Sequence, residues 1–220
     1  MFDLDGVLLR GDAFTVLVRH ALARRPWRLV PAAVLLTASL ALPAGGPGRF
    51  RINRALVRLA LRGIDETRYE ALAVRIGTEL AQSAFRNDSL IEEARRCREA
   101  GSRVIVVTAT ERRLARSYLN AVGLGDTELV ASELTFPSDR PASLATYNIG
   151  SQKVCSLVEL DVDLTSCLFY TDSATDLPLM RRVAECILVA PHRATLRAVR
   201  LAEPPIAIKS GDGGYRDLAP

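Results

Sequence analysis

The spacing of apolar residues changes near the middle of the chain. Between residues 13 and 86 apolar positions recur every three or four residues, and this period predicts amphipathic helices. Helices are expected at about 13–24, 50–62 and 65–85, and a further one follows at 87–101. The stretch up to residue 86 is therefore predicted to be helical, without a strand.

After residue 101 short apolar runs alternate with helical segments. The runs at 104–107, 129–136, 167–170 and 186–190 predict buried strands. Strands that are apolar on both faces and alternate with helices are typical of a parallel sheet covered on both sides. We therefore expect an α/β fold, a Rossmann-like parallel sheet with helices on both faces.

The two ends of the chain depart from this pattern. Only Met1 and Phe2 precede Asp3, although a central strand usually has about five or six residues. Three or four missing apolar residues, at roughly 1.5–3 kcal/mol each, would rival a net stability of about 5–15 kcal/mol. We therefore expect the natural start to lie upstream. The segment from Glu203 is rich in Pro and Gly and is expected to fray.

Residues 29–42 are largely apolar and carry no charge. As a helix, at 1.5 Å per residue, this stretch would be about 21 Å long. A bilayer core is about 30 Å thick and needs roughly 20 residues, so a membrane span is not predicted. We expect a helix buried in the protein, and the alternative is a helix lying on a membrane surface.

The helix expected at 50–62 is basic on one side and apolar on the other. Its basic residues are Arg51, Arg54, Arg58 and Arg62. This pattern favours a solvated face opposite a core face. The alternative is attraction to anionic lipid head groups or to a phosphorylated substrate. Residues 27–62 are thus the part of the chain expected to make any peripheral membrane contact.

Composition narrows the class of protein. The 220 residues are 49% hydrophobic and 25% charged, as in a globular protein with a real core. The net charge of +4 is scattered, so no nucleic-acid partner is expected. Acidic residues at positions 3 and 5 are unlike a signal peptide, which favours a cytoplasmic location. Reduced, buried thiols are expected for Cys97, Cys155, Cys167 and Cys186, which form no Cys-x-x-Cys pair.

The first candidate for chemistry is the pair Asp3 and Asp5, followed by Gly6. In an extended backbone, residues two apart point to the same side. Two carboxylates that close repel each other, and a divalent cation removes the conflict. The alternative is an ordinary turn or helix start, in which Asp and Gly are common. The pair therefore suggests a metal-assisted carboxylate site that needs support from elsewhere in the chain.

That support comes from polar residues at the ends of the other predicted strands. Thr108 and Asp172 each follow an apolar run, Asp176 comes four residues after Asp172, and Lys153 opens a helix. Taken singly, Thr108 would be a strand-end hydroxyl, Asp176 a helix cap and Lys153 a solvated surface charge. Ligands bind beyond the carboxyl ends of the strands in such sheets, so together these residues predict one site.

Four segments match a known family in order and spacing. They are Phe2-Asp3-Leu4-Asp5-Gly6, Val106-Val107-Thr108-Ala109-Thr110, Gly150-Ser151-Gln152-Lys153 and Tyr170-Thr171-Asp172-Ser173-Ala174-Thr175-Asp176. The set resembles the haloacid dehalogenase-like hydrolase superfamily, especially its phosphoserine-phosphatase-like branch. The resemblance implies that residues 1–12 and 87–220 form the α/β core and that residues 13–86 form an inserted all-α cap domain.

The resemblance also implies a reaction and a cofactor. The protein would be a Mg²⁺-dependent phosphatase that hydrolyses a phosphate monoester through an aspartyl-phosphate intermediate. Asp3 would be the nucleophile, and Asp5 would protonate the leaving oxygen and then activate water. Mg²⁺ would be held by Asp3, by the backbone carbonyl of Asp5 and by Asp172.

The remaining site residues carry over in the same way. Thr108 would hydrogen-bond a phosphoryl oxygen, and Lys153 would neutralise its charge. Asp176 would orient Lys153 or the water shell of the metal.

Other functions stay open at this point. The same aspartyl-phosphate can pass to an acceptor other than water, so a phosphotransferase or mutase is one alternative. A membrane-associated interaction module with weak or no catalysis is another. The substrate would be a phosphorylated small molecule or a phosphorylated lipid, selected by the cap.

Overall fold

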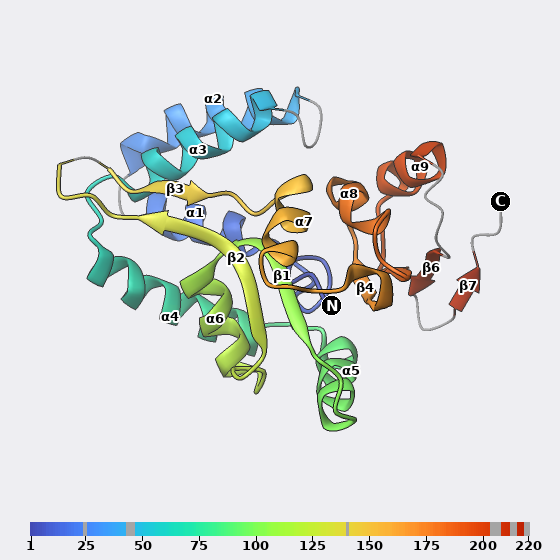
Figure 1. Cartoon of the computed structure of the whole chain (residues 1–220). Coiled ribbons are helices and arrows are strands. Elements are labelled where there is room, and N and C mark those ends of the chain that lie inside the picture. The colour runs from blue at the N-terminus through green and yellow to red at the C-terminus, as the bar shows by residue number, and fades with distance from the viewer. Residues whose placement is uncertain (24–25, 43–46, 140, 203–207, 212–214, 218–220) are drawn as a thin grey trace.

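The computed structural model describes residues 1–23, 26–42, 47–139, 141–202, 208–211 and 215–217, and it shows helices around a central sheet (Figure 1). The stretch predicted to be helical is helical where it is described. It contains α1 (Ala13–Ala23), a 3₁₀ turn (Pro26–Arg28), α2 (Leu29–Leu40), α3 (Pro47–Leu61) and α4 (Glu66–Gln82). The later helices are α5 (Asp88–Glu99), α6 (Arg112–Ala121), α7 (Ser151–Val158), α8 (Leu177–Met180) and α9 (Arg193–Ala202).

The sheet is parallel in its centre, as predicted. Its parallel strands are β1 (Ile105–Glu111), β2 (Glu128–Thr135), β4 (Leu168–Thr171), β5 (Glu185–Leu188) and β6 (Ile208–Gly211). Two antiparallel strands, β3 (Ser143–Thr146) and β7 (Tyr215–Asp217), lie at its edges. The order is β3-β2-β1 in one part and β4-β5-β6-β7 in the other.

The N-terminal residues join these two parts of the sheet. The backbone N–H of Phe2 donates to Ile105 O at 2.9 Å, and Val107 N–H donates to Phe2 O at 2.9 Å. On the other side, Asp3 N–H donates to Tyr170 O at 2.9 Å. The Phe2 ring also stacks on Tyr170 with its centroid 4.5 Å away. The segment 1–3 is therefore a short central strand, paired on both sides.

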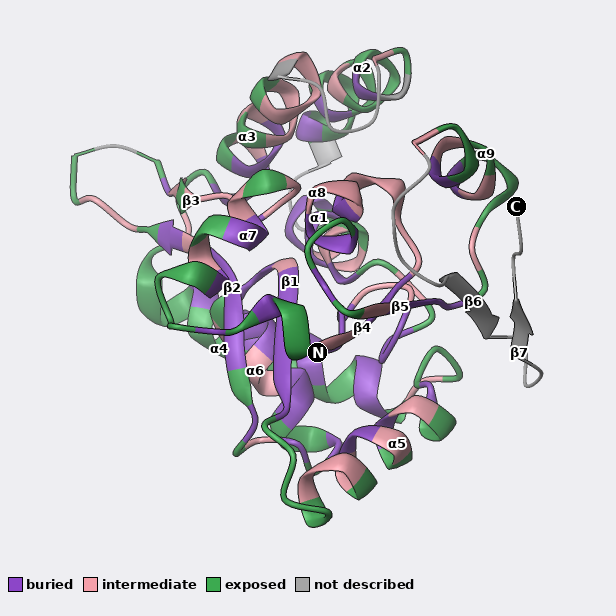
Figure 2. Cartoon of the chain, turned by 45° about the vertical axis from the view of Figure 1, so that its right-hand side comes forward, coloured by how far each residue is buried: buried purple, intermediate pink, exposed green. Residues whose placement is uncertain are grey.

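Side chains of the central strands alternate between two hydrophobic clusters. Val106 and Tyr170 pack in the cluster that includes the buried residues of α5 and α6. Val107 and Phe169 pack in the other, with residues of α7, α8 and α9. Helices thus cover both faces of the sheet, and β1, β2, β4 and β5 are mostly buried (Figure 2). The predicted α/β fold class is confirmed.

Three strands were not predicted from the sequence. β3 lies in the stretch 137–147, which reads as a loop, and β6 and β7 lie in the segment expected to fray. All three have four residues or fewer, and each depends on a neighbouring strand: β3 pairs with β2, β6 with β5 and β7 with β6. A pattern of two alternating positions is too short to predict a strand. The rest of the terminal segment lies outside the described residues.

α4 links the helical stretch to the core. It begins at Asp65, whose carboxylate accepts a hydrogen bond from Arg68 N–H at 2.8 Å and so caps the helix. It then packs along α6, so closely that a Cβ on Gly77 would lie 2.6 Å from Ser117 Oγ. In Figure 1, α2 and α3 lie together at the top of the molecule, away from this contact.

Burial differs from the expectation in two places. α2 was expected to be buried, but Val30 and Val34 are 72% and 62% exposed, and Trp27 in the preceding 3₁₀ turn is 69% exposed. α2 packs on α3, and its outer face has no partner among the described residues, which explains the difference. No helix in the described ranges is long and apolar enough to cross a membrane. All four thiols are free, as expected, but only Cys186 is buried; Cys97 and Cys167 are half-buried and Cys155 is exposed.

The basic helix has the predicted two-sided pattern. On α3, Leu56 and Val57 are buried, whereas Arg51, Arg54 and Arg58 are exposed. The buried side of α3 faces the interior, where it contributes to the cavity described below. The core face expected from the sequence is confirmed.

Candidate active site

The predicted site begins where the short central strand ends. Asp3 is buried; its Oδ1 accepts a hydrogen bond from Leu4 N–H at 2.7 Å, and its Oδ2 accepts one from Lys153 Nζ at 2.8 Å. Burial raises the pKa of Asp3 well above its usual value, and the Lys153 ammonium opposes that rise. Asp3 is thus a desolvated carboxylate with a single cationic partner.

Gly6 is required where the chain turns after this strand. Its φ is +76°, in the left-handed region that favours glycine. A Cβ at this position would lie 2.1 Å from Cγ of Asp172. The turn therefore brings the backbone of residue 6 against the Asp172 carboxylate, and the first and last predicted segments converge here.

Lys153 is fully buried between two carboxylates. Its Nζ donates to Asp3 Oδ2 and, at 2.9 Å, to Asp176 Oδ2. Asp176 Oδ2 also accepts from Thr171 Oγ1 at 2.7 Å, whereas Oδ1 has no partner in the described part of the chain. Burial alone would lower the pKa of Lys153, but Asp176 and Asp3 outweigh it and raise the pKa above its ordinary value. Lys153 therefore stays charged at neutral pH.

Asp5 lies at the same cavity with a different environment. Its Oδ1 accepts from Ala13 N–H at 2.8 Å, and its Oδ2 accepts from the Thr110 hydroxyl. Burial, followed by the charge of Asp12, raises the pKa of Asp5 to about 7. A carboxyl group that titrates near neutrality can both donate and accept a proton, as general acid–base catalysis requires.

Thr110 is a site residue that sequence reasoning missed. It lines the cavity and donates to Asp5, whereas the predicted Thr108 is fully buried and does not line the cavity. Thr108 Oγ1 accepts from Thr110 N–H at 3.0 Å, which leaves its O–H proton available as a donor. Thr110 ends the second matched segment and lies in β1, and only the folded structure shows that it reaches Asp5.

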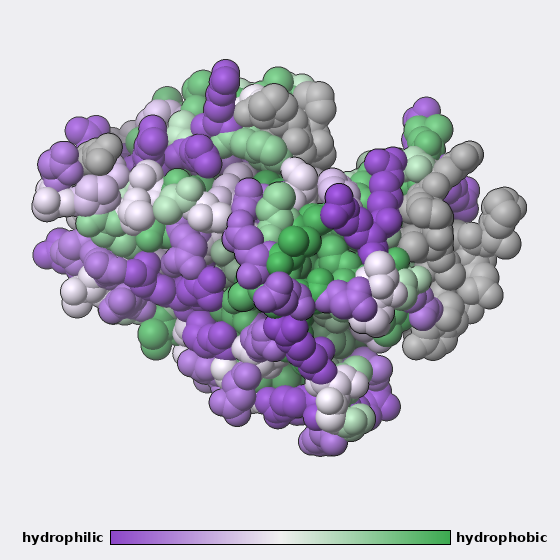
Figure 3. Space-filling view, viewed as in Figure 1, coloured by the Kyte–Doolittle hydropathy of each residue, from purple (hydrophilic) through white to green (hydrophobic). Residues whose placement is uncertain are grey.

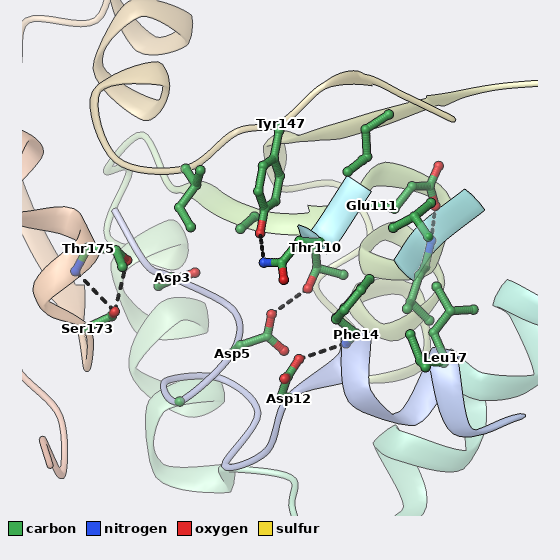
Figure 4. A pocket seen from close by; sticks show the side chains of 18 of the residues that line it. Asp3, Asp5, Asp12, Phe14, Leu17, Thr110, Glu111, Tyr147, Ser173 and Thr175 are labelled. Carbon is green, nitrogen blue, oxygen red and sulfur yellow. Dashed lines mark hydrogen bonds between the residues drawn. The ribbon is translucent and has the colours of Figure 1, made fainter. Parts of the chain in front are cut away.

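These residues form one end of a large cavity of about 660 Å³. Asp3, Asp5, Lys153 and Asp172 lie at this end. Figure 4 shows Asp3 and Asp5 on one side of the pocket and residues of α1, Phe14 among them, on the other. The cavity therefore joins the sheet edge to the helices of the first half of the chain.

The donor atoms at this end fit a hard divalent cation. Asp3 and Asp172 offer carboxylate oxygens, the backbone of Asp5 offers a carbonyl, and Mg²⁺ prefers oxygen ligands. Burial, and then the charge of Asp176, raises the pKa of Asp172, which shows that its negative charge is poorly compensated by Lys153. Within the described ranges no group of three or more His, Cys, Asp or Glu side chains is placed to hold a metal. A site of two carboxylates and one backbone carbonyl uses only two such side chains, so it is consistent with that finding.

Comparison with solved structures supports the fold. A protein of unknown function from Bordetella pertussis Tohama I superposes with a TM-score of 0.72 at 20% identity, over 93% of this chain and 95% of that one. A phosphoserine phosphatase solved as a phospho-aspartyl intermediate analogue gives 0.60 at 14% identity, over 90% and 88%. Cytosolic 5'-nucleotidase IIIB bound to cytidine gives 0.64 at 11% identity, over 96% and 79%.

The sequence itself matches a family model. No functionally curated protein matches it significantly. The model for haloacid dehalogenase-like hydrolases, however, matches residues 1–181, which include all four predicted motif segments. With the α/β fold that it shares with solved phosphoserine phosphatases, the chain belongs to the haloacid dehalogenase-like hydrolases.

Proposed function

We propose that this protein is a Mg²⁺-dependent phosphatase that hydrolyses a phosphate monoester through an aspartyl-phosphate on Asp3. One observation carries the proposal: the buried Asp3 carboxylate contacts the buried Lys153 ammonium at the polar end of a cavity. Asp5, with its pKa near 7, faces the same cavity. A nucleophile, a fixed positive charge and an acid–base group are the parts that phosphoryl transfer needs.

The proposed reaction has two displacements. In the first, a carboxylate oxygen of Asp3 attacks phosphorus, the bond from phosphorus to the ester oxygen breaks, and Asp5 gives its proton to that oxygen. In the second, Asp5 takes a proton from water as the water oxygen attacks phosphorus. The bond to Asp3 then breaks and inorganic phosphate leaves, which restores both carboxyl groups.

The other residues position and neutralise charge. Lys153, fixed by Asp176, places one positive charge beside the phosphoryl oxygens. The hydrogen bond expected from Thr108 to a phosphoryl oxygen stays a prediction, because Thr108 is fully buried and lies outside the cavity lining. Asp3, Asp172 and the carbonyl of Asp5 would hold Mg²⁺. When bound, the ion supplies charge neutralisation for the phosphoryl group.

The direct test is an Asp3→Asn variant. It keeps the size of the side chain and the hydrogen bond from Leu4 but removes the nucleophile. The wild-type protein should release phosphate from a panel of phosphate monoesters with Mg²⁺ and not with chelator. A folded Asp3→Asn protein that still turns over would refute the assignment. Transfer of the phosphoryl group to an added alcohol in preference to water would favour a phosphotransferase or mutase.

A second candidate role, peripheral membrane contact, is favoured by the outer face of α2. Val30 and Val34 are exposed there, as is Trp27 in the 3₁₀ turn before the helix, and Figure 3 shows hydrophobic residues beside hydrophilic ones along the upper edge of the molecule, where α2 lies. Exposed arginines of α3 lie on the neighbouring helix, and basic side chains beside an apolar face suit an anionic membrane surface. The expected cytoplasmic location is compatible with such contact.

Vesicle flotation tests this second role. Wild-type protein should float with vesicles that contain anionic lipid, and a Val30→Glu, Val34→Glu double variant should not. Val74→Glu is the matched control, because Val74 is 59% exposed on α4, apart from α2. If the wild-type protein did not float with these vesicles, peripheral membrane contact would be refuted.

A further inference from the structure

The cavity continues from its acidic end into an apolar arm. The arm is lined by side chains from α1, α3, α6, β2 and β3, which the fold brings together from distant parts of the chain. They include Leu17, Val57, Leu61, Leu114, Leu134 and Leu144. All but Leu144 are buried, at 6% exposure or less. A substrate group that enters this arm therefore meets carbon atoms on several sides.

Acidic groups beside the arm are already engaged. The Asp12 carboxylate accepts hydrogen bonds from Phe14 N–H and from the Thr15 backbone and hydroxyl, at 2.6 to 3.2 Å. Glu111 accepts from the Tyr69 hydroxyl at 2.6 Å and from two backbone N–H groups at the start of α6. A substrate ammonium group would therefore have to break existing hydrogen bonds to find a carboxylate here.

Polar side chains near the arm are paired with each other as well. Asn53 Nδ2 donates to the Tyr147 hydroxyl at 3.1 Å, and Asn53 Oδ1 accepts from Ser39 Oγ at 3.2 Å (Figure 4 shows Tyr147 beside Thr110). Arg49, half-buried in the lining, makes no hydrogen bond or ion pair within the described ranges. Near the arm the described lining thus offers the unpaired guanidinium of Arg49, whereas the carboxylates of Asp12 and Glu111 are engaged, which does not match the ammonium group of a zwitterionic amino acid.

From this lining we infer that the substrate is the phosphate monoester of an apolar alcohol, whose hydrocarbon part fills the arm while the phosphate meets Asp3 and Lys153. The inference rests on the proposed phosphatase function. A volume of about 660 Å³ falls in the usual range of sites for small ligands, so the arm has room for a chain or ring beyond the phosphate. Burying hydrocarbon in the arm raises kcat/KM without any polar side chain that recognises the substrate.

The test is a series of n-alkyl phosphates from ethyl to octyl, with phosphoserine as the polar comparison. We expect kcat/KM to rise about four-fold per methylene while the chain is entering the arm, the fold-change that corresponds to one buried CH₂. Phosphoserine should be hydrolysed no faster than ethyl phosphate. Equal kcat/KM along the series, or a preference for phosphoserine, would overturn the inference and leave the phosphatase function standing.

If no substrate of the series is hydrolysed with Mg²⁺, the proposed function has failed, and binding still decides the inference. Calorimetry with n-alkyl phosphonates, which cannot be hydrolysed at the carbon–phosphorus bond, should then show affinity that increases with chain length. Affinity independent of chain length would overturn the inference on its own.

Variants locate the effect in the arm. Leu144→Asp puts a carboxylate on the half-buried β3 wall and should lower the octyl-to-ethyl ratio of kcat/KM at least about tenfold. Val57→Thr, nearly the same size, should lower it several-fold and serves if the first variant does not fold. Leu201→Asp is the control, since Leu201 is 78% exposed on α9 and does not line the cavity. Unchanged ratios in both arm variants would contradict the assignment.

Discussion

Replacement of Gly6 by alanine separates two roles of this glycine. With φ at +76°, an alanine here is strained by about 1–2 kcal/mol, as at any left-handed position. Its Cβ would also lie 2.1 Å from Cγ and 2.2 Å from Oδ2 of Asp172. Relief of that overlap requires the Asp172 carboxylate or the turn to move by at least about 1.4 Å, to the ordinary carbon contact distance of about 3.5 Å.

Gly101 provides the matched control for this change. Its φ is +81°, so alanine is strained there to a similar degree, but no heavy atom of the described chain lies within 4 Å of the added Cβ. Gly101→Ala should lose about 1–2 kcal/mol of unfolding free energy in urea titrations, and Gly6→Ala should lose more because of its overlap with Asp172. Gly6→Ala alone should lose activity, because a displacement of about 1 Å at a reacting centre can cost about 100-fold.

The assay is phosphate release at increasing Mg²⁺ concentration. We expect Gly6→Ala to lower kcat/KM about 100-fold and to raise the Mg²⁺ concentration needed for half-maximal activity, since Asp172 is a proposed ligand. Gly101→Ala should match the wild-type protein in both respects. If Gly6→Ala kept wild-type Mg²⁺ dependence, the close approach of residue 6 to Asp172 would have no role in metal binding.

Three further outcomes are expected. Lys153→Met should abolish turnover and, by leaving buried acids without their partner, cost about 3–5 kcal/mol in urea denaturation; a stable, active variant would contradict the buried ion pair. Thr110→Val removes a hydrogen bond that favours ionised Asp5, so the pKa of Asp5 should rise from about 7 to a higher value. The limb of the pH–rate profile that reports Asp5 should therefore move to higher pH. A shift to lower pH would have the wrong sign. Chelation should stop phosphate release with an unchanged circular dichroism spectrum, and added Mg²⁺ should restore it; activity that survives chelation would remove the cofactor proposal.

The core of the fold was predictable because its strands are short and apolar throughout. Residues 104–107 and 167–170, at the starts of β1 and β4, are continuous hydrophobic runs that no helix period explains, and polar residues follow them directly. The same local signal placed Asp3, Lys153 and Asp176 near one sheet edge, where the structure brings their side chains into contact. Their roles in catalysis stay predictions.

What the sequence did not reveal depends on which elements pack together. Hydrophobicity alone predicted burial of α2, but burial needs a covering partner, and α3 supplies one along only part of its surface. The same dependence on packing explains why Thr110 and the apolar arm were not predicted from the sequence. Leu17 and Leu144 are far apart in the chain, and only the folded structure shows that they line one cavity.

The pairing of residues 1–3 has a consequence for the order of folding. Phe2 takes its neighbours from residues more than one hundred and more than one hundred and sixty positions later in the chain. Contacts of such long sequence separation form late and slowly, because a large loop must close first. During synthesis Asp3, the proposed nucleophile, therefore waits for β4 before its backbone is paired. A ribosome-bound chain that stops short of residue 168 contains the residues of α1 to α7 but lacks the strand that holds Asp3.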